Sequence, residues 1–479
     1  MRFVTTRGPR FFRAVPGRSS DALSTTARQQ GVSFHTALIQ GLGPDGGLYV
    51  PETIEPMAAD ELTRLPSRRL TEVAYRVLRP YTRGELDATT FEAVVVEALN
   101  FPIPLVQVEP NVFALELFHG PTLAFKDVGA RLMARLMAAL DTGAQLLTVL
   151  AATSGDTGSA VAHAFHGVPH TRVVVLYPEG RVSPTQEAQL TMFNSEAGNV
   201  RAYAVAGSFD DCHRLTKEVF GDADLRSRVR LTSANSVNIG RLLPQMVYYF
   251  HAMAQLGADA RRVLPDPPGG RASSAAEVIV CTPSGNFGNL TAGLMAKRAG
   301  LPVAHFVAAT NVNDVVPEYL LTGRFEPRPS VPTISNAMDV GNPSNFERMR
   351  WLYHGDLDAM RQDVAGSRHG DEEVRQTIKR VYETRGYLLD PHSAIAYLGL
   401  KQELRALAGP AATHPARPSA GRVGVFLATA HPAKFGEVVE PIIRRPIVTP
   451  APLADALARP RHILRIDASL DAVTEALGA

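Results

Sequence analysis

The sequence predicts an α/β protein with two doubly wound, mostly parallel-sheet domains and a small N-terminal domain. Four segments repeat the order of apolar run, small-residue turn and helix-like stretch, and a fifth apolar run covers 171–180. The runs are rich in β-branched residues and do not alternate with polar ones, which is typical of parallel strands covered on both faces. Strands that alternate with helices indicate doubly wound sheets, whose ligands bind at the carboxyl ends of the strands. The four repeating segments are 145–165, 277–296, 303–320 and 422–439.

Changes in composition predict the domain boundaries. Residues 1–98 hold helical patterns and one extended piece, GGLYVPE, and form the small N-terminal domain. Stretches rich in Pro, Gly, Ala and Ser, with no periodicity, indicate linkers or surface insertions. The predicted units after residue 98 are an α/β domain over 99–262, a linker or insertion over 263–276, an α/β domain over 277–445 with a second such insertion at 407–421, and a C-terminal segment over 446–479 that packs back on the core.

Composition excludes several classes of protein. The 47 acidic and 49 basic residues nearly balance, which argues against binding to nucleic acid or a membrane surface through bulk charge. Two cysteines, Cys212 and Cys281, are too few for a disulfide framework, so we expect a reducing compartment, the cytoplasm. No apolar run approaches the length of a membrane span. The arginine-rich first twenty residues precede no apolar segment, which favours a basic, loosely ordered insertion over a targeting peptide.

Other motifs are excluded by their context. GLGPDG (41–46) matches a dinucleotide-binding pattern, but no strand precedes it and Pro44 lacks the backbone donor that such a turn needs. We therefore interpret it as a turn into the strand LYVPE. No lysine follows a glycine, which excludes a P-loop, and no G-x-S-x-G hydrolase motif occurs. The fourteen histidines show no metal-binding spacing, so no metal site is predicted.

Only two of the six lysines are candidates for covalent chemistry. Four of them lie in helical stretches beside charged residues, where solvated surface is the simplest interpretation. Lys126 and Lys434 remain, and Lys126 directly follows the apolar Leu123, Ala124 and Phe125. An apolar pocket lowers the pKa of a lysine amine and makes it nucleophilic. On this flank alone, a lysine that caps a helix remains the alternative.

Two glycine-containing turns, each between a strand and a helix, favour anion binding near that lysine. In PSGNFGN (283–289), the glycines let the backbone approach an anion, and the helix N-terminus adds unpaired N–H groups. TSGDTG (153–158) has the same layout, with hydroxyl donors at Ser154, Thr157 and Ser159. For TSGDTG the alternative is an ordinary turn capped by Asp156 or Thr157.

A third stretch, SANSVNIGR (233–241), also has the character of an anion site. Arg241 offers a planar fork that suits phosphate, and Asn235 and Ser236 can donate beside it. Taken alone, this stretch is better explained by a capped helix start with a surface arginine. DPHSA (390–394) is interpreted as an Asp N-cap followed by Pro at the first helical position.

Taken together, these stretches resemble the threonine synthase family, pyridoxal-phosphate enzymes of fold type II, the tryptophan-synthase-β type. The resemblance follows the family order over most of the chain and is closest to the longer branch of bacteria and fungi. The matching pieces are GLGPDGGLYVPE, HGPTLAFKD, ATSGDTG, SFDDC, SANSVNIGR, PSGNFGN, DPHSA and LATAHPAKF. The chain departs from relatives at Val128, where an aromatic residue is frequent, and at Asp156, where shorter-branch members carry Asn.

The resemblance implies a set of site residues. Lys126 would link covalently to pyridoxal 5'-phosphate and serve as the catalytic base. A glycine-lined cradle would hold the cofactor phosphate, and a hydroxyl would bond to the pyridine nitrogen. The residues implied to hold the cofactor are Lys126, Gly285, Asn286, Phe287, Asn289 and Thr429. Those implied to hold the substrate are Ser154 and Thr157 at its carboxylate, and Asn235, Ser236 and Arg241 at its phosphate.

The implied activity is the conversion of O-phospho-L-homoserine and water to L-threonine and phosphate, by γ-elimination and β-addition, in threonine biosynthesis. A related lyase that forms a keto acid and ammonia would share every motif. A non-catalytic relative is a further alternative, against which the intact Lys126, PSGNFGN and Thr429 argue. Members of the longer branch are often monomeric, which we take as the expectation. No metal, nucleic acid or membrane partner is expected.

Overall fold

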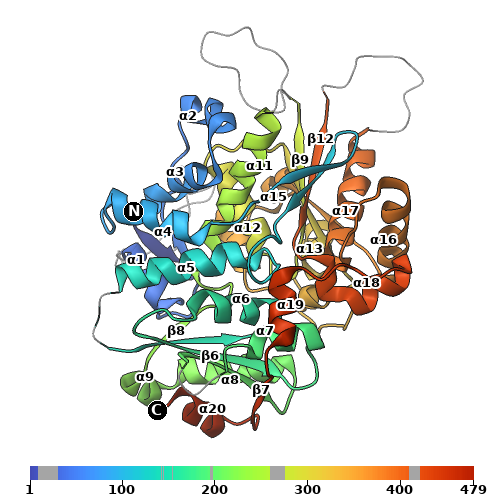
Figure 1. Ribbon diagram of the computed structural model, residues 1–479. Coiled ribbons are helices and arrows are strands. Elements are labelled where there is room, and N and C mark those ends of the chain that lie inside the picture. Colours follow the sequence, from blue (N-terminus) through green and yellow to red (C-terminus); the bar gives the residue numbers. More distant parts are fainter. Residues whose placement is uncertain are drawn as a thin grey trace, which may run out of the picture.

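The structure, a computed structural model, describes residues 1–8, 31–141, 143, 145–153, 155–194, 198–258, 276–408 and 421–478. Two large sheets lie at opposite sides of the molecule, with helices between them and on their outer faces (Figure 1). Most of the basic N-terminal stretch and most of both predicted insertions, 263–276 and 407–421, lie outside the described residues. The predicted α/β class with mostly parallel sheets is confirmed.

The first sheet has five strands, all parallel to their neighbours, in the order β13-β7-β6-β5-β8. Two of them, β5 and β6, are the strands that the sequence predicts in this half of the chain. Both are buried almost throughout, which explains their continuous apolar sequence. The strands span β5 (Leu147–Ala152), β6 (Thr171–Pro178), β7 (Val200–Val205), β8 (Arg230–Ser233) and β13 (Leu464–Ile466).

The second sheet has six strands in the order β11-β10-β9-β12-β4-β3. Only β3 runs antiparallel to its neighbour, since it forms a hairpin with β4 at one edge. The three predicted strands of this half, β9, β10 and β12, occupy the centre. The strands span β3 (Leu105–Glu109), β4 (Val112–Glu116), β9 (Val278–Pro283), β10 (His305–Thr310), β11 (Val364–Arg368) and β12 (Val423–Ala428).

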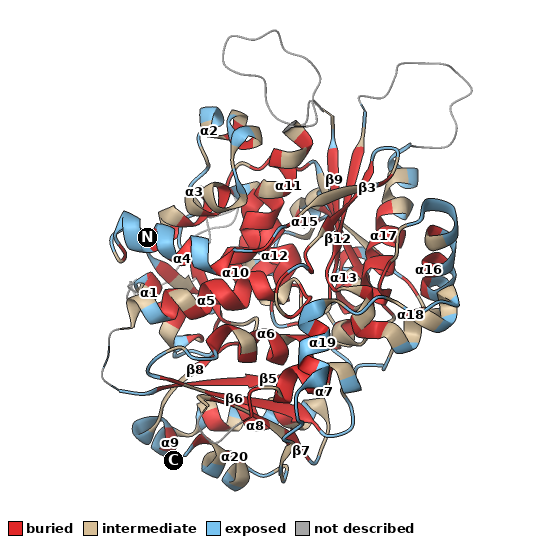
Figure 2. Cartoon of the chain, viewed as in Figure 1, coloured by how far each residue is buried: buried red, intermediate tan, exposed pale blue. Residues whose placement is uncertain are grey.

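Both faces of each large sheet are covered (Figure 2). In β9, Val278 and Val280 face the core that is shared with the central helices, whereas Ile279 and Cys281 face a second core under helix α17. This period of two, with apolar residues on both sides, is why the strands show no alternation of apolar and polar residues. The thiols of Cys212 and Cys281 are both free and buried.

Helices connect the strands and fill the space between the sheets. Helices α2 and α3 are among the helical patterns predicted within residues 1–98, and α3 packs on α11. The α-helices are α1 (Phe34–Gln40), α2 (Ala59–Thr63), α3 (Leu70–Thr82), α4 (Ala88–Ala98), α5 (Lys126–Leu140), α6 (Asp156–Phe165), α7 (Pro184–Thr191), α8 (Phe209–Gly221), α9 (Ala223–Arg228), α10 (Ile239–Leu242), α11 (Met246–Ala258), α12 (Gly288–Arg298), α13 (Val315–Thr322), α14 (Phe346–Leu352), α15 (Leu357–Asp363), α16 (Asp371–Arg385), α17 (Pro391–Ala408), α18 (Gly436–Ile443), α19 (Ala451–Ala458) and α20 (Leu470–Leu477). None of the helices in the described ranges is both long and apolar enough to cross a membrane.

The N-terminal residues join the rest of the molecule through a small antiparallel sheet and a shared core. Strand β1 (Phe3–Thr5) pairs with β2 (Tyr49–Pro51), which is the predicted extended piece. GLGPDG forms the predicted turn, in which the Asp45 carboxylate accepts a hydrogen bond from the Gly47 N–H (2.9 Å). Helix α4 packs on α5, so this part of the chain reaches the helix that begins at Lys126. The apolar core is continuous across this boundary.

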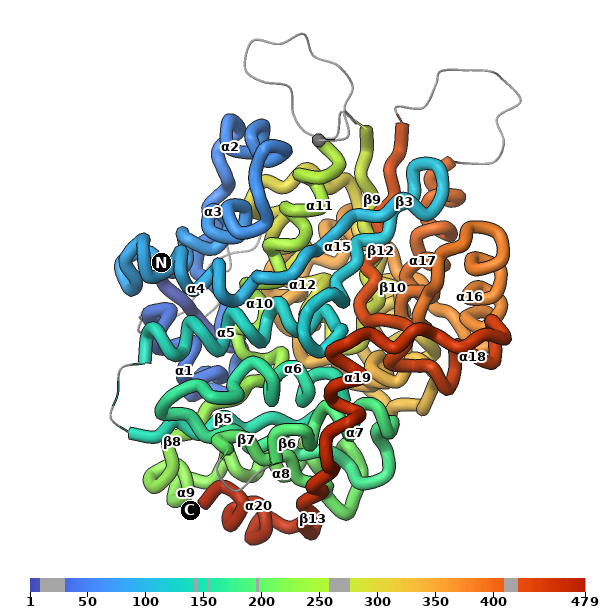
Figure 3. The backbone as a smooth tube through the Cα atoms, viewed as in Figure 1, coloured from blue at the N-terminus to red at the C-terminus, as the bar shows by residue number. Residues whose placement is uncertain are grey.

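The last part of the chain returns to the first sheet. After α18 the backbone runs past α19, which packs on α7, and reaches the free edge of β7 (Figure 3). There β13 pairs in parallel with β7, and α20 packs on α8. The first sheet is therefore completed by residues that follow the second sheet in sequence. The domain division that the sequence predicts stays a prediction.

Candidate active site

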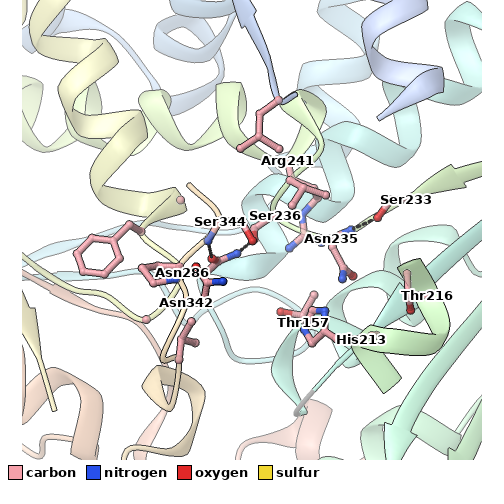
Figure 4. A pocket seen from close by; sticks show the side chains of 18 of the residues that line it. Thr157, His213, Thr216, Ser233, Asn235, Ser236, Arg241, Asn286, Asn342 and Ser344 are labelled. Carbon is pink, nitrogen blue, oxygen red and sulfur yellow. Dashed lines mark hydrogen bonds between the residues drawn. The ribbon is translucent and has the colours of Figure 1, made fainter. Parts of the chain in front are cut away.

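One cavity of about 1740 Å³ lies at the carboxyl ends of the central strands of both sheets. It receives side chains from the turns after β5, β8, β9 and β12, the position at which doubly wound sheets bind ligands. Figure 4 shows polar side chains from both halves of the chain converging on it. The sequence-predicted residues that line it are Lys126, Thr157, Asn235, Ser236, Arg241, Gly285, Asn286, Phe287, Asn289 and Thr429. Ser154 lies outside the described residues.

Lys126 is held beside Thr429 by direct pairing of two backbone segments. The N–H of Phe125 donates to the carbonyl of Thr429 (2.8 Å), and the N–H of His431 donates to the carbonyl of Leu123 (3.0 Å). Leu123 adopts a left-handed conformation, with φ of 58°, which turns the chain into helix α5. Lys126 is the first residue of that helix, and Thr429 is buried against the same cavity.

The neighbouring residue Asp127 fixes the turn that precedes Lys126. Its carboxylate accepts hydrogen bonds from the Thr122 N–H (2.9 Å) and hydroxyl (2.7 Å). A side chain at position 120 would collide with that carboxylate, because a Cβ there would lie 2.5 Å from an Asp127 oxygen. Burial raises the pKa of Asp127 to about 6, which the two bonds from Thr122 oppose. The Lys-Asp pair thus combines a cavity lysine with a structural carboxyl group.

The amine of Lys126 titrates well below an ordinary lysine. Burial lowers its pKa to about 8, and the positive charges of Arg241 and Lys434 act in the same direction, whereas Asp156 opposes them. Because pH 7 lies about one unit below this pKa, about a tenth of the Lys126 amine is uncharged near neutral pH. An uncharged amine can act as a nucleophile or as a base.

The turn between β9 and α12 forms a cradle of backbone N–H groups. Asn289 fixes it from below: its side chain donates to the Pro283 carbonyl (2.8 Å) and accepts from the Ser284 hydroxyl (2.9 Å). Phe287 is held in a left-handed conformation with φ of 60°, a strained state that is frequent at functional sites. No group in the described part of the chain accepts from the N–H groups of residues 285–288. They are free to bind an anion at the start of α12.

Gly285 is required by close packing. A Cβ at this position would lie 2.8 Å from the Met338 Cα and 2.9 Å from the Ala337 carbonyl oxygen, both backbone atoms. The segment 336–344 therefore presses directly on the cradle and contributes to the cavity wall. No motif in the sequence indicates a role for this segment.

The SANSVNIGR stretch forms the opposite wall, between β8 and α10. Arg241 is buried, its guanidinium donates to the Ala234 carbonyl (2.6 Å), and its Nε has no partner among the described residues. Burial lowers the pKa of Arg241 to about 10, so the side chain remains a cation near neutral pH. Its backbone packs against Gly129, one helical turn after Lys126. Asn235 also carries a buried side-chain oxygen that accepts no hydrogen bond from any described residue.

Asn286 links the two walls across the cavity. Its side-chain amide donates to the Ser236 hydroxyl (2.5 Å), and its oxygen accepts from the Ser344 N–H (2.5 Å), as Figure 4 shows. The cradle after β9 and the loop after β8 are thereby held at a fixed separation. Two sites with anion-binding character face one another, with the amine of Lys126 in the same cavity.

The alternative interpretation of the TSGDTG turn is a turn capped by Asp156 or Thr157, but the structure shows a different arrangement. The cap is Thr153, whose hydroxyl accepts from the N–H groups of Gly155 (3.0 Å) and Gly158 (2.8 Å). Asp156 instead pairs with Lys434, with 2.8 Å between the Lys434 Nζ and an Asp156 oxygen. Lys434 is fully buried, and its pairing makes it the second lysine of the site.

Two further residues were missed as contributors to the site. Arg348 is fully buried, and its five N–H donors make five hydrogen bonds, to the carbonyls of Tyr49 (two bonds), Ser236 and Val237 and to the Asn345 side chain. It ties the loop after β8 to β2, but an arginine in an ordinary helical pattern gives no signal in the sequence.

Asp390 is the N-cap that the sequence predicts for α17, since it accepts from the Ser393 N–H (3.0 Å). His392, in the same motif, also lines the cavity and accepts from the Ala337 N–H (3.3 Å).

Comparison with known proteins assigns the chain to a class. Residues 96–413 match the family described as "Pyridoxal-phosphate dependent enzyme", so the chain belongs to that class of enzymes. Residues 22–99 match "Threonine synthase N terminus", and residues 408–477 match "Threonine synthase, C-terminal". Within the class, the chain is a member of the threonine synthase family.

Relatives and solved structures agree with this assignment. The chain is 46% identical to the threonine synthase of Haemophilus influenzae over 87% of this chain and 89% of the relative. It is 41% identical to that of Escherichia coli over 88% of this chain and 91% of the relative. The crystal structure of the Escherichia coli threonine synthase superposes with a TM-score of 0.82 and 39% identity, covering 94% of this chain and 97% of the other. The structure of PLP-bound threonine synthase from Brucella melitensis gives 0.83 and 36%, with coverage of 100% and 98%.

Proposed function

We propose that this chain converts O-phospho-L-homoserine and water to L-threonine and phosphate, as a pyridoxal-phosphate-dependent carbon–oxygen lyase. The observation that carries the proposal is the amine of Lys126, with its lowered pKa, in a cavity that also holds two facing anion sites. One anion site suits the phosphate of the cofactor and the other the phosphate of the substrate. The family membership of the chain supports the same activity.

The residues present fit the cofactor. The free N–H groups of residues 285–288 would bind its phosphate, together with the positive end of helix α12. The Lys126 amine would bind its aldehyde carbon, and the Thr429 hydroxyl would meet its pyridine nitrogen. When bound, the cofactor withdraws electrons from the α-carbon of an attached amino acid. A hydroxyl, unlike a carboxylate, leaves the pyridine nitrogen largely unprotonated, which we expect to restrain side reactions.

The remaining chemistry falls to residues of the chain. Lys126 would act as the base that removes the proton from the α-carbon of the substrate, which its lowered pKa favours. Arg241, with Asn235 and Ser236, would hold the substrate phosphate and stabilise it as it leaves the γ-carbon. Thr157 and Ser154 would bind the substrate carboxylate. A second proton is lost from the β-carbon as the phosphate leaves, and the γ-carbon then takes up a proton to become a methyl group. Water adds at the β-carbon, the α-carbon regains its proton, and threonine is released.

A spectrum and a product assay test this proposal. The purified protein should absorb in the near-visible range and, on addition of O-phospho-L-homoserine, release threonine and phosphate in equal amounts. A keto acid and ammonia in place of threonine would identify the related lyase. Near-visible absorbance with neither product would identify a non-catalytic relative. We place the enzyme in the cytoplasm and expect a monomer, which the molecular mass in solution tests.

A further inference from the structure

Lys434 makes contacts that no catalytic role yet explains. It is fully buried, its Nζ lies 2.8 Å from an Asp156 oxygen, and it also donates to the Thr122 carbonyl (2.8 Å). The same Asp156 oxygen accepts a hydrogen bond from the Gln186 side chain (3.3 Å). Asp156 is 5% exposed and lines the cavity that contains Lys126. One carboxylate oxygen is thus fixed by two donors, in a place where its charge acts on the reactive amine.

The charges around Lys126 show why this matters. Asp156 is the acidic group that attracts a proton to the Lys126 amine, whereas Arg241 and Lys434 repel it. The carboxyl of Asp127 lies next in sequence but is bonded to Thr122. Among the described residues, the charged or titratable groups that act on Lys126 or Asp156 from the surrounding elements are Asp156 on α6, Arg241 on α10, His392 on α17 and Lys434 after β12.

A lone carboxylate at Asp156 would stabilise the ammonium form of Lys126, which is inert as a nucleophile and as a base. We propose that Lys434 is a positioning residue that holds the Asp156 carboxylate and cancels its charge, so that Lys126 can remain an uncharged amine beside it. The inference rests on the proposed role of Lys126 as the residue that takes up the cofactor. The proposal requires that the charges of residues 156 and 434 offset one another in their effect on Lys126. An ion pair with a purely structural role makes no such requirement.

Opposite effects of two substitutions test the charge balance. Lys434→Met keeps the length of the side chain but leaves Asp156 uncompensated, so we expect the Lys126 amine to titrate at higher pH. Asp156→Asn keeps the shape but leaves Lys434 uncompensated, so we expect titration at lower pH. The double variant removes both charges and should titrate close to the unmodified chain.

The measurement is the rate at which added pyridoxal phosphate is incorporated into the full-length chain after removal of the bound cofactor. The rate is followed through the near-visible absorbance over a range of pH. We expect the midpoint to rise by about one unit in Lys434→Met and to fall by about as much in Asp156→Asn, since loss of a nearby like or opposite charge in a buried site shifts a pKa by about one unit or more. Near neutral pH, Lys434→Met should therefore incorporate the cofactor about tenfold more slowly. Lys126→Ala, which should show no incorporation, defines the background.

Shifts of both single variants in the same direction, no shift in either, or a double variant that stays displaced would overturn the proposal. If Lys434→Met does not fold, the comparison of Asp156→Asn with the double variant decides, because removal of the Lys434 charge should then raise the midpoint. None of these measurements uses O-phospho-L-homoserine. A chain that shows the expected midpoints but forms no threonine would contradict the proposed function and leave the role of Lys434 standing.

Discussion

Arg241→Ala provides the sharpest test of how the substrate is held. In the unmodified chain the guanidinium is 4% exposed, donates once to the Ala234 carbonyl, and has an Nε with no partner among the described residues. The cation therefore keeps unused donors beside Asn235 and Ser236, at the wall that faces the cofactor cradle. Replacement by alanine removes a buried positive charge and these donors, but leaves the cradle at residues 285–288 intact.

The size of the effect follows from two contributions. A hydrogen bond to a charged group contributes about 1.5–3 kcal/mol. Two opposite charges about 5 Å apart interact with about 3 kcal/mol at an effective dielectric constant of about 20. The two contributions overlap, since both describe the same ion pair, so we expect a loss of about 2–4 kcal/mol, or about 30- to 1000-fold in affinity for the phosphorylated substrate.

Binding and rate measurements separate the two anion sites. Inorganic phosphate is titrated into the cofactor-loaded variant, the KM for O-phospho-L-homoserine is measured from initial rates, and affinity for pyridoxal phosphate is measured independently on the chain without cofactor. Arg241→Lys is the matched control, because it keeps the charge but not the planar fork. It should lose less affinity for the phosphorylated substrate than Arg241→Ala. Equal losses of substrate and cofactor affinity in Arg241→Ala would refute the assignment of Arg241 to the substrate phosphate.

Four more predictions follow from the site. Lys126→Ala should abolish the near-visible absorbance of the bound cofactor and nearly all turnover, so substantial threonine formation by this variant would contradict its central role. Thr429→Asp should raise the proportion of side products such as keto acids, and an unchanged ratio of threonine to keto acid would argue against the function given to its hydroxyl. Arg348→Lys keeps the charge but can make at most three of the five hydrogen bonds, so urea unfolding should show a loss of about 3 kcal/mol in the free energy of unfolding. A urea midpoint equal to that of the unmodified chain would contradict this prediction. In the unmodified chain, cofactor incorporation should rise about tenfold per pH unit and level off above a pH of about 8; a rise that continues past pH 10 would show that the amine of Lys126 is unperturbed.

The sequence predicted the central strands well, and the reason is physical. Strands β5, β6, β9, β10 and β12 are buried on both faces, so each is a continuous apolar run that ends where a turn begins. The edge strands were not predicted individually. Strand β13 has only three residues, none of them fully buried, and its place beside β7 depends on contacts from a remote part of the chain.

The same distinction applies to the site. Lys126, the cradle and the loop after β8 carry local signals, namely an apolar flank and glycine turns at strand ends, and the structure brings them into one cavity. The pairing of Lys434 with Asp156 and the five bonds of Arg348 link residues that are far apart in sequence. Neither residue type nor spacing encodes such contacts. Lys434 remains a candidate because, unlike the four surface lysines, it does not lie in a helical stretch beside charged residues, but its partner is apparent only from the fold.

The backbone pairing of Phe125 with Thr429 has a consequence for the newborn polypeptide. The ribosome delivers Lys126 early, but Thr429 and Lys434 emerge only when most of the chain has been synthesised. A nascent chain thus carries Lys126 long before it has the walls that bury its amine and lower its pKa. We therefore expect capture of the vitamin-derived aldehyde to await the late segments, and thus to follow synthesis of most of the chain.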